Sequence, residues 1–107
     1  MINKSLKYLI KVGDKVLPCY TTMGAQRRLK ALTGVDLLNG DALTGDAVYA
    51  YLYCAVAAAC NAEGMPFEYD IETFFDLLDP DEAAKFYTDM AERAKKKVAA
   101  LQSQASK

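Results

Sequence analysis

Histidine is absent from this chain of 107 residues. It is the commonest general base, the usual partner of a nucleophilic serine or cysteine, and the commonest nitrogen ligand of metals. The only serines (Ser5, Ser103 and Ser106) lie in the terminal segments, away from any candidate base. The chain also lacks a glycine-rich phosphate loop and a metal-binding helix motif. The sequence therefore predicts a protein that is not an enzyme and that needs no cofactor or metal.

Paired cysteines are lacking as well. Cys19, Cys54 and Cys60 are an odd number and show no CxxC spacing. Cys54 and Cys60 are six residues apart on a predicted helix, about 240° around its axis, so they point to different faces. This arrangement favours small buried side chains in a reducing compartment over a disulfide or a metal site.

A strong net charge and a long apolar run are also missing. The formal net charge is −1, which gives no overall field for nucleic acid or for an anionic membrane. The longest nearly uncharged run, Ala47 to Ala62, is shorter than the ~18–20 residues that cross a bilayer. Lysines interrupt the N-terminal segment where a signal peptide needs an apolar stretch. We therefore expect a cytoplasmic protein without a membrane partner.

The composition that remains is typical of a folded domain, with 52% hydrophobic and 25% charged residues. The length fits one domain with one core that needs no disulfide. We expect a single helical domain with an N-terminal β-hairpin over residues 1–102. A polar tail over residues 103–107 is expected to fray.

The order of apolar and turn residues predicts a mainly α (α+β) fold, in which an N-terminal β-hairpin packs on a small bundle of about four helices. Residues 6–12 and Val16–Tyr20 are the two strands, joined at Gly13-Asp14-Lys15. Pro18 has no N–H, so the second strand should carry an unpaired edge there. Helices are predicted over about Thr22 to Thr33 with Gly34 as the C-terminal cap, Asp46 to Ala62, Asp70 to Leu78, and Pro80 to Leu101.

Two groups of carboxylates superficially suggest a cation site or acid/base chemistry. Asp36, Asp41 and Asp46 recur every five residues, which does not match the alternating ligands of a calcium loop, so we interpret them as turn and cap residues. The segment from Asp79 to Glu82 has the spacing of a capping box, with Asp79 as N-cap and Glu82 at the N3 position.

Partner binding is the remaining possibility, and three surfaces are candidates. An edge of the hairpin and an apolar stripe on the last helix are candidates for strand addition and helix docking. Their residues are Val16, Leu17, Cys19 and Tyr20 on the hairpin and Tyr87, Met90, Ala94, Val98 and Leu101 on the last helix. A basic patch could form from Arg27, Arg28, Lys30, Lys95, Lys96 and Lys97. No aromatic residues interleave with these cations to stack on bases, which favours solvated helix faces over nucleic-acid binding.

Residues 6–38 combine a strand with a Gly-Asp turn, a Tyr-Thr-Thr start to the first helix, and a Leu-Thr-Gly end. The segments concerned are Leu9 to Lys15, Tyr20 to Thr22, and Leu29 to Leu38. This combination resembles the N-terminal part of the tail assembly chaperones of long-tailed phages and of related prophage and gene-transfer-agent particles. The rest of the chain is similar in plan only. The chain departs from the family in its first helix, where members often carry acidic residues and this sequence has Arg27, Arg28 and Lys30.

The resemblance implies a non-catalytic chaperone that binds the tape-measure protein and keeps it soluble until tail-tube protein replaces it. It also implies self-association on one client chain, and absence from the finished virion. Two other classes stay open. One is a small nucleic-acid-associated or regulatory module that uses the basic residues, and the other is a structural head–tail connector subunit of a phage particle.

Overall fold

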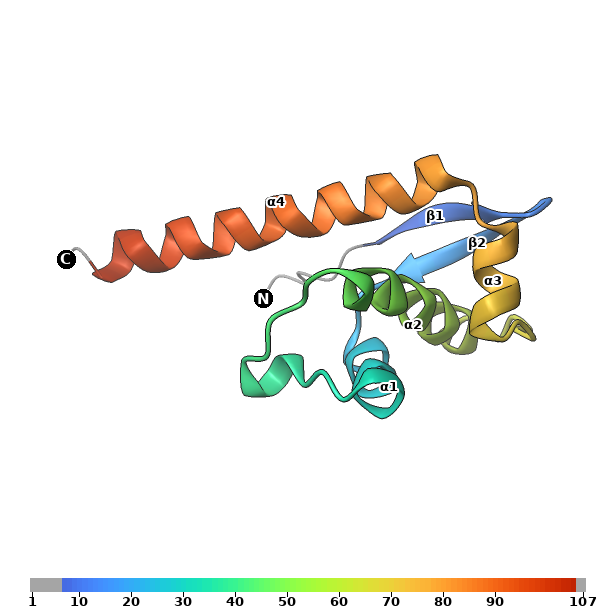
Figure 1. Cartoon of the computed structure of the whole chain (residues 1–107), viewed down its shortest axis with the longest axis horizontal. Helices are drawn as coiled ribbons and strands as arrows, with labels where there is room; N and C mark the ends of the chain where they lie inside the picture. Colours follow the sequence, from blue (N-terminus) through green and yellow to red (C-terminus); the bar gives the residue numbers. More distant parts are fainter. Residues whose placement is uncertain (1–6, 106–107) are drawn as a thin grey trace.

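The computed structural model describes the main chain of residues 7–105 and the side chains of residues 9–92 (Figure 1). Its elements are β1 (Lys7–Val12), β2 (Lys15–Tyr20), α1 (Met23–Thr33), a short 3₁₀ helix η1 (Leu37–Asn39), α2 (Asp46–Ala62), α3 (Ile71–Leu77) and α4 (Pro80–Ala105). The predicted α+β fold, a hairpin followed by four α-helices, is confirmed. The last helix ends at Ala105 and not at Leu101, while the domain boundary at residue 102 stays a prediction.

The hairpin has a two-residue turn, because Val12 pairs with Lys15 across the antiparallel strands. Gly13 stands at the first turn position with a φ of 64°, which a two-residue hairpin turn with glycine there requires. In this register Ile10 lies opposite Leu17, and both side chains are buried. Leu9 and Val16 belong to the other face and are exposed. The alternation expected of a half-buried strand pair therefore decides which side chains reach the core.

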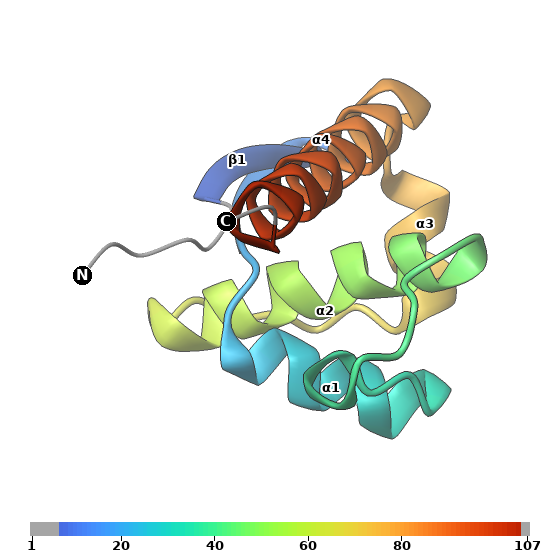
Figure 2. The ribbon, with the colours of Figure 1, turned by 90° about the vertical axis from the view of Figure 1, so that its left-hand side faces the viewer.

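Helix α2 is the centre of the molecule. It lies between α1 on one side and the hairpin with α4 on the other, while α3 packs across one end (Figures 1 and 2). Ten of its seventeen residues are buried, as its apolar sequence predicts. Small residues let α1 approach closely, since a Cβ atom added to Gly24 would lie 3.7 Å from the Cβ atom of Ala58.

An aromatic cluster fixes α3 and the connection before it to α2. The ring of Phe74 lies 5.3 Å from that of Tyr53 and 6.0 Å from that of Phe67, centroid to centroid. The hydroxyl of Tyr53 donates a hydrogen bond of 2.6 Å to the carbonyl oxygen of Tyr69. Tyr53 thus partly buries its ring and satisfies its polar end on the main chain, as expected for a tyrosine at the edge of a core.

The start of α4 is attached to the hairpin by a contact that differs from the predicted capping box. Asp79 accepts a hydrogen bond of 2.8 Å from the N–H of Asp81, as a cap should. Glu82, however, accepts one of 3.0 Å from the N–H of Lys11 and does not close the box. The predicted role of Glu82 is therefore wrong. The reason is a tertiary contact. The N–H of Lys11 lies at the outer edge of β1, where no strand of the described residues accepts its hydrogen bond, and Glu82 supplies the acceptor.

Replacing Glu82 by alanine should lower the free energy of unfolding by about 1 kcal/mol, because a partly solvated hydrogen bond to a charged acceptor is lost. Urea denaturation followed by circular dichroism measures this change. Asp81→Ala is the matched control, since it removes a carboxylate from the same helical turn and leaves the contact with β1 intact. Equal losses in the two variants would show that the contact between Glu82 and Lys11 contributes nothing.

Candidate helix-binding groove

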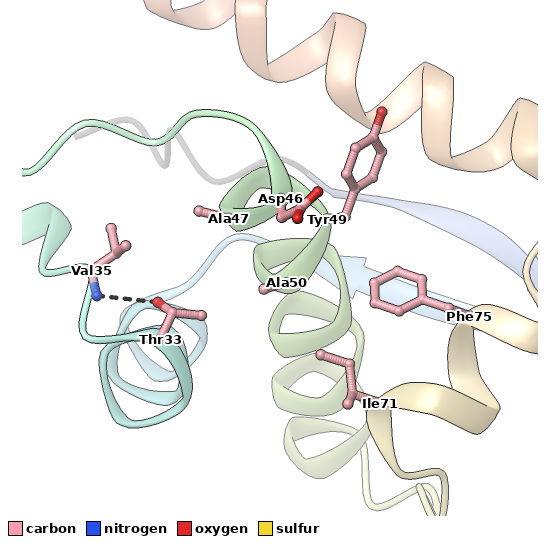
Figure 3. A pocket seen from close by; sticks show the side chains of 8 residues that line it. All are labelled: Thr33, Val35, Asp46, Ala47, Tyr49, Ala50, Ile71 and Phe75. Carbon is pink, nitrogen blue, oxygen red and sulfur yellow. Dashed lines mark hydrogen bonds between the residues drawn. The ribbon is translucent and has the colours of Figure 1, made fainter.

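An apolar groove lies between the C-terminal end of α1, the N-terminal half of α2, and α3 (Figure 3). It has a volume of about 660 Å³ and is open to solvent. Its lining consists of Thr33, Val35, Asp46, Ala47, Tyr49, Ala50, Ile71 and Phe75. Asp46 is the one carboxylate in this lining, so the groove offers mainly shape and apolar surface.

The end of α1 forms one wall. Gly34 adopts a left-handed conformation with a φ of 85°, and its N–H donates to the carbonyl oxygen of Lys30, which confirms the predicted cap. The hydroxyl of Thr33 donates to the carbonyl oxygen of Leu29 at 2.9 Å and accepts from the N–H of Val35 at 3.1 Å. These bonds turn the chain sharply, so that Val35 lies at the groove (Figure 3).

The aspartates that follow α1 stabilise the connection to α2. Asp36 accepts a hydrogen bond from the N–H of Asn39 and forms an ion pair of 3.2 Å with Lys30. The hydrogen bond from Lys30 is the main reason why the pKa of Asp36 lies below its ordinary value. Asp41 accepts a hydrogen bond of 2.8 Å from the N–H of Asp36. Within residues 9–92, no group of three or more His, Cys, Asp or Glu side chains is placed to hold a metal ion.

The opposite wall comes from α3, where Ile71 and Phe75 are one helical turn apart. Asp70 caps this helix by accepting a hydrogen bond of 2.8 Å from the N–H of Thr73, as predicted. Tyr49 marks the end of the groove next to α4 (Figure 3). Its ring lies 5.7 Å from that of Tyr87, centroid to centroid. The first half of α4 thus borders the groove.

The hairpin surface predicted to bind partners is only partly available. Val16 is exposed, and Tyr20 is half-buried. Leu17 and Cys19 are buried in the core, so their side chains cannot contact a partner. The alternation of the strand turns Leu17 and Cys19 toward the core, and Pro18 between them is buried as well.

The two edges of the hairpin differ. The edge of β1 is covered, because the N–H of Gly13 donates a hydrogen bond of 2.8 Å to Leu77 and Val12 forms an isolated bridge with Leu78. The sheet of the described residues contains only β1 and β2, so no further strand pairs with the edge of β2. Pro18 stands opposite Leu9 in that strand and offers no N–H. The unpaired edge expected at Pro18 stays a prediction.

The inner face of α4 is centred on Phe86, which the predicted stripe omits. Phe86 is fully buried, with its ring 6.2 Å from that of Tyr51. Tyr87 is 42% exposed, and Met90 is half-buried against the core. The spacing Ala83–Phe86–Met90 is as regular as the predicted one, so the sequence alone could have given this residue.

The remaining predicted residues of α4 belong to its second half. The side chains of Ala94, Val98, Leu101, Lys95, Lys96 and Lys97 lie outside the described residues. Their main chain is helical and belongs to the part of α4 that extends beyond every other labelled element (Figure 1).

The cations of α1 are exposed, and two of them form a hydrogen bond or an ion pair with residues nearby in the sequence. Arg28 donates a hydrogen bond of 3.3 Å to the carbonyl oxygen of Gly24, and Lys30 is paired with Asp36. Arg27 is exposed on the same helix. Local partners of this kind are typical of a solvated helix face.

Comparison of the chain with family models, curated proteins and solved structures gives no match. No helix within the described residues is long and apolar enough to cross a membrane. Sequence patterns did not reveal this groove, since its lining residues come from three elements and none stands out by type.

Proposed function

We propose that this chain is a non-catalytic assembly chaperone that binds helical segments of a phage tape-measure protein and keeps them soluble during tail assembly. The observation that carries the proposal is the open apolar groove between α1, α2 and α3. Grooves of this kind accept the apolar face of an amphipathic helix, whose side chains recur every three or four residues.

The lining of the groove suits a client with many similar helices. Alanines at positions 47 and 50 leave room, and Ile71 and Phe75 offer apolar contacts without directional hydrogen bonds. Binding through such a surface depends on shape and on burial of apolar area, so it tolerates differences in client sequence. Several weakly bound copies on one long client gain avidity, while tail-tube protein can still displace each of them.

The site favours this proposal over a nucleic-acid-associated module, because Arg28 and Lys30 of α1 have local acceptors and the groove lining carries no cation. A structural head–tail connector subunit is the second alternative. Such a subunit would be found in purified particles, whereas the proposed chaperone would act in the host cytoplasm and be absent from the mature virion.

Co-expression with the tape-measure protein of the same phage genome tests the proposal. The wild-type chain should keep the tape-measure protein in the soluble fraction, and Ala47→Arg should reduce that fraction roughly tenfold, because a long cation fills the groove. Ala62→Arg is the matched control, since it makes the same change at an exposed position near the other end of α2.

Circular dichroism should show that both variants are folded. The proposal fails if Ala47→Arg solubilises the tape-measure protein as well as Ala62→Arg does. It also fails if the tape-measure protein is equally soluble without this chain.

A further inference from the structure

Charge is strongly separated along this chain. Eleven acidic residues and no lysine or arginine lie between Ala31 and Ala84. Five lysines and arginines and no acidic residue lie between Arg93 and Lys107. The net charge of −1 hides this division. Opposite charges on separate segments favour contact between them, and such contacts fix orientation when they flank an apolar surface.

Acidic residues lie on two sides of the groove, at the start of α2 and along α3. Asp46 contributes to the lining and is exposed. Glu72 and Asp76 directly follow the groove residues Ile71 and Phe75 on α3, and both are exposed. An occupant of this groove should therefore be apolar along one face and basic beside it.

The sequence of residues 93–105 has the pattern of such an occupant. Ala94, Val98 and Leu101 recur at spacings of four and three, and Arg93, Lys95, Lys96 and Lys97 lie in the same segment. The thirteen helical residues are about 20 Å long, which is enough to lie along a groove built from three helices.

A chain cannot place this segment in its own groove. The first half of α4 already borders the groove where Tyr87 stacks on Tyr49. From there the helix continues away from the other elements, as its long axis in Figure 1 and its end-on view in Figure 2 show. A continuous helix cannot return, so the groove that receives residues 93–105 must belong to another copy.

We propose that residues 93–105 of one copy occupy the groove of a second copy, which joins the copies head to tail. This proposal rests on the proposed function, because it uses the same groove and states which segment fills that groove when no client is bound. A contact between two different surfaces is heterologous, so repetition gives a ring or an open chain of copies. A client helix then has to displace the tail of the neighbouring copy from the groove, so binding of a client separates the two copies.

Mixing two full-length variants tests the proposal without any client, so its outcome is independent of the chaperone assay. The groove variant is Asp46→Lys with Asp76→Lys, and the tail variant is Val98→Asp with Leu101→Asp. Light scattering coupled to size-exclusion chromatography should show that the wild type exceeds the 11.7 kDa of one chain and grows with concentration. Each variant alone should associate at least about tenfold more weakly.

An equimolar mixture of the two variants should give a 1:1 dimer and nothing larger, because only one intact groove and one intact tail remain to meet. Asp14→Lys with Glu63→Lys makes the same charge change at exposed positions outside the groove and should associate like the wild type. Ala47→Arg provides a second groove variant that changes no acidic residue.

Three results would overturn the proposal. The first is a wild type that stays monomeric at every concentration tested, and the second is a mixture of the two variants that does not form the dimer. The third is a control variant that loses association as fully as the groove variant does.

Discussion

Replacement of Phe86 by alanine is expected to lower the free energy of unfolding by about 3–5 kcal/mol. The side chain is fully buried, and its ring packs edge-on against Tyr51 at 6.2 Å. Removal leaves a cavity between α4 and α2 in addition to the lost transfer energy of the ring. Small domains are stable by only about 5–15 kcal/mol, so the variant should approach the unfolding threshold.

Urea denaturation measures the effect, with Tyr87→Ala as the matched control. Tyr87 is the next residue on the same helix and is 42% exposed, so its loss removes less buried surface. The control should lose about 1 kcal/mol, since one partly exposed aromatic contact disappears. Similar losses in the two variants would contradict the inner face that we assign to α4.

The second large effect concerns pH. Burial raises the pKa of the Cys54 thiol from an ordinary value of 9.0 to about 11, although the positive charge of Arg28 acts in the opposite direction. The folded protein therefore holds this proton more tightly than the unfolded chain does. The resulting stability is fully present below pH 9 and is lost as the pH rises through 11.

Between pH 8 and pH 11 the contribution of Cys54 should fall by about 2 kcal/mol. Cys54→Ala removes this contribution, so its free energy of unfolding should decline less steeply over the same interval. The difference between the two curves therefore reports Cys54 together with its effect on Tyr53, whose pKa is raised first by burial and then by the charges of Asp70 and Cys54. Parallel curves would show that the thiol titrates alike in the folded and unfolded states.

Local patterns predicted most of the fold. The Leu-Thr-Gly end of α1, the Asp70 cap of α3 and the uniformly apolar α2 all depend on interactions within a few residues, and the structure has them as expected. Where tertiary contacts compete, the prediction failed. Glu82 has the spacing of a capping residue, yet it bonds to Lys11, which is 71 residues away in sequence.

The groove was beyond prediction for the same reason. Val35, Ala47 and Phe75 become neighbours only when α1 and α3 have docked on α2. The hairpin shows the opposite case, since alternation alone already places Leu17 and Cys19 inside. The candidate edge consisted of Val16, Leu17, Cys19 and Tyr20. If the alternation of the strand is applied to these residues, Val16 remains as the main exposed apolar side chain.

Nuclear magnetic resonance tests most directly whether the groove between α1, α2 and α3 binds helices. An amphipathic helical peptide from the tape-measure protein is titrated into the isotope-labelled full-length Val98→Asp/Leu101→Asp variant, which should be monomeric with an empty groove. We predict that the largest chemical-shift changes fall on the amides of Val35, Ala47, Ile71 and Phe75. Changes confined to Leu9 and Val16 on the hairpin, or none at a large excess of peptide, would contradict the account.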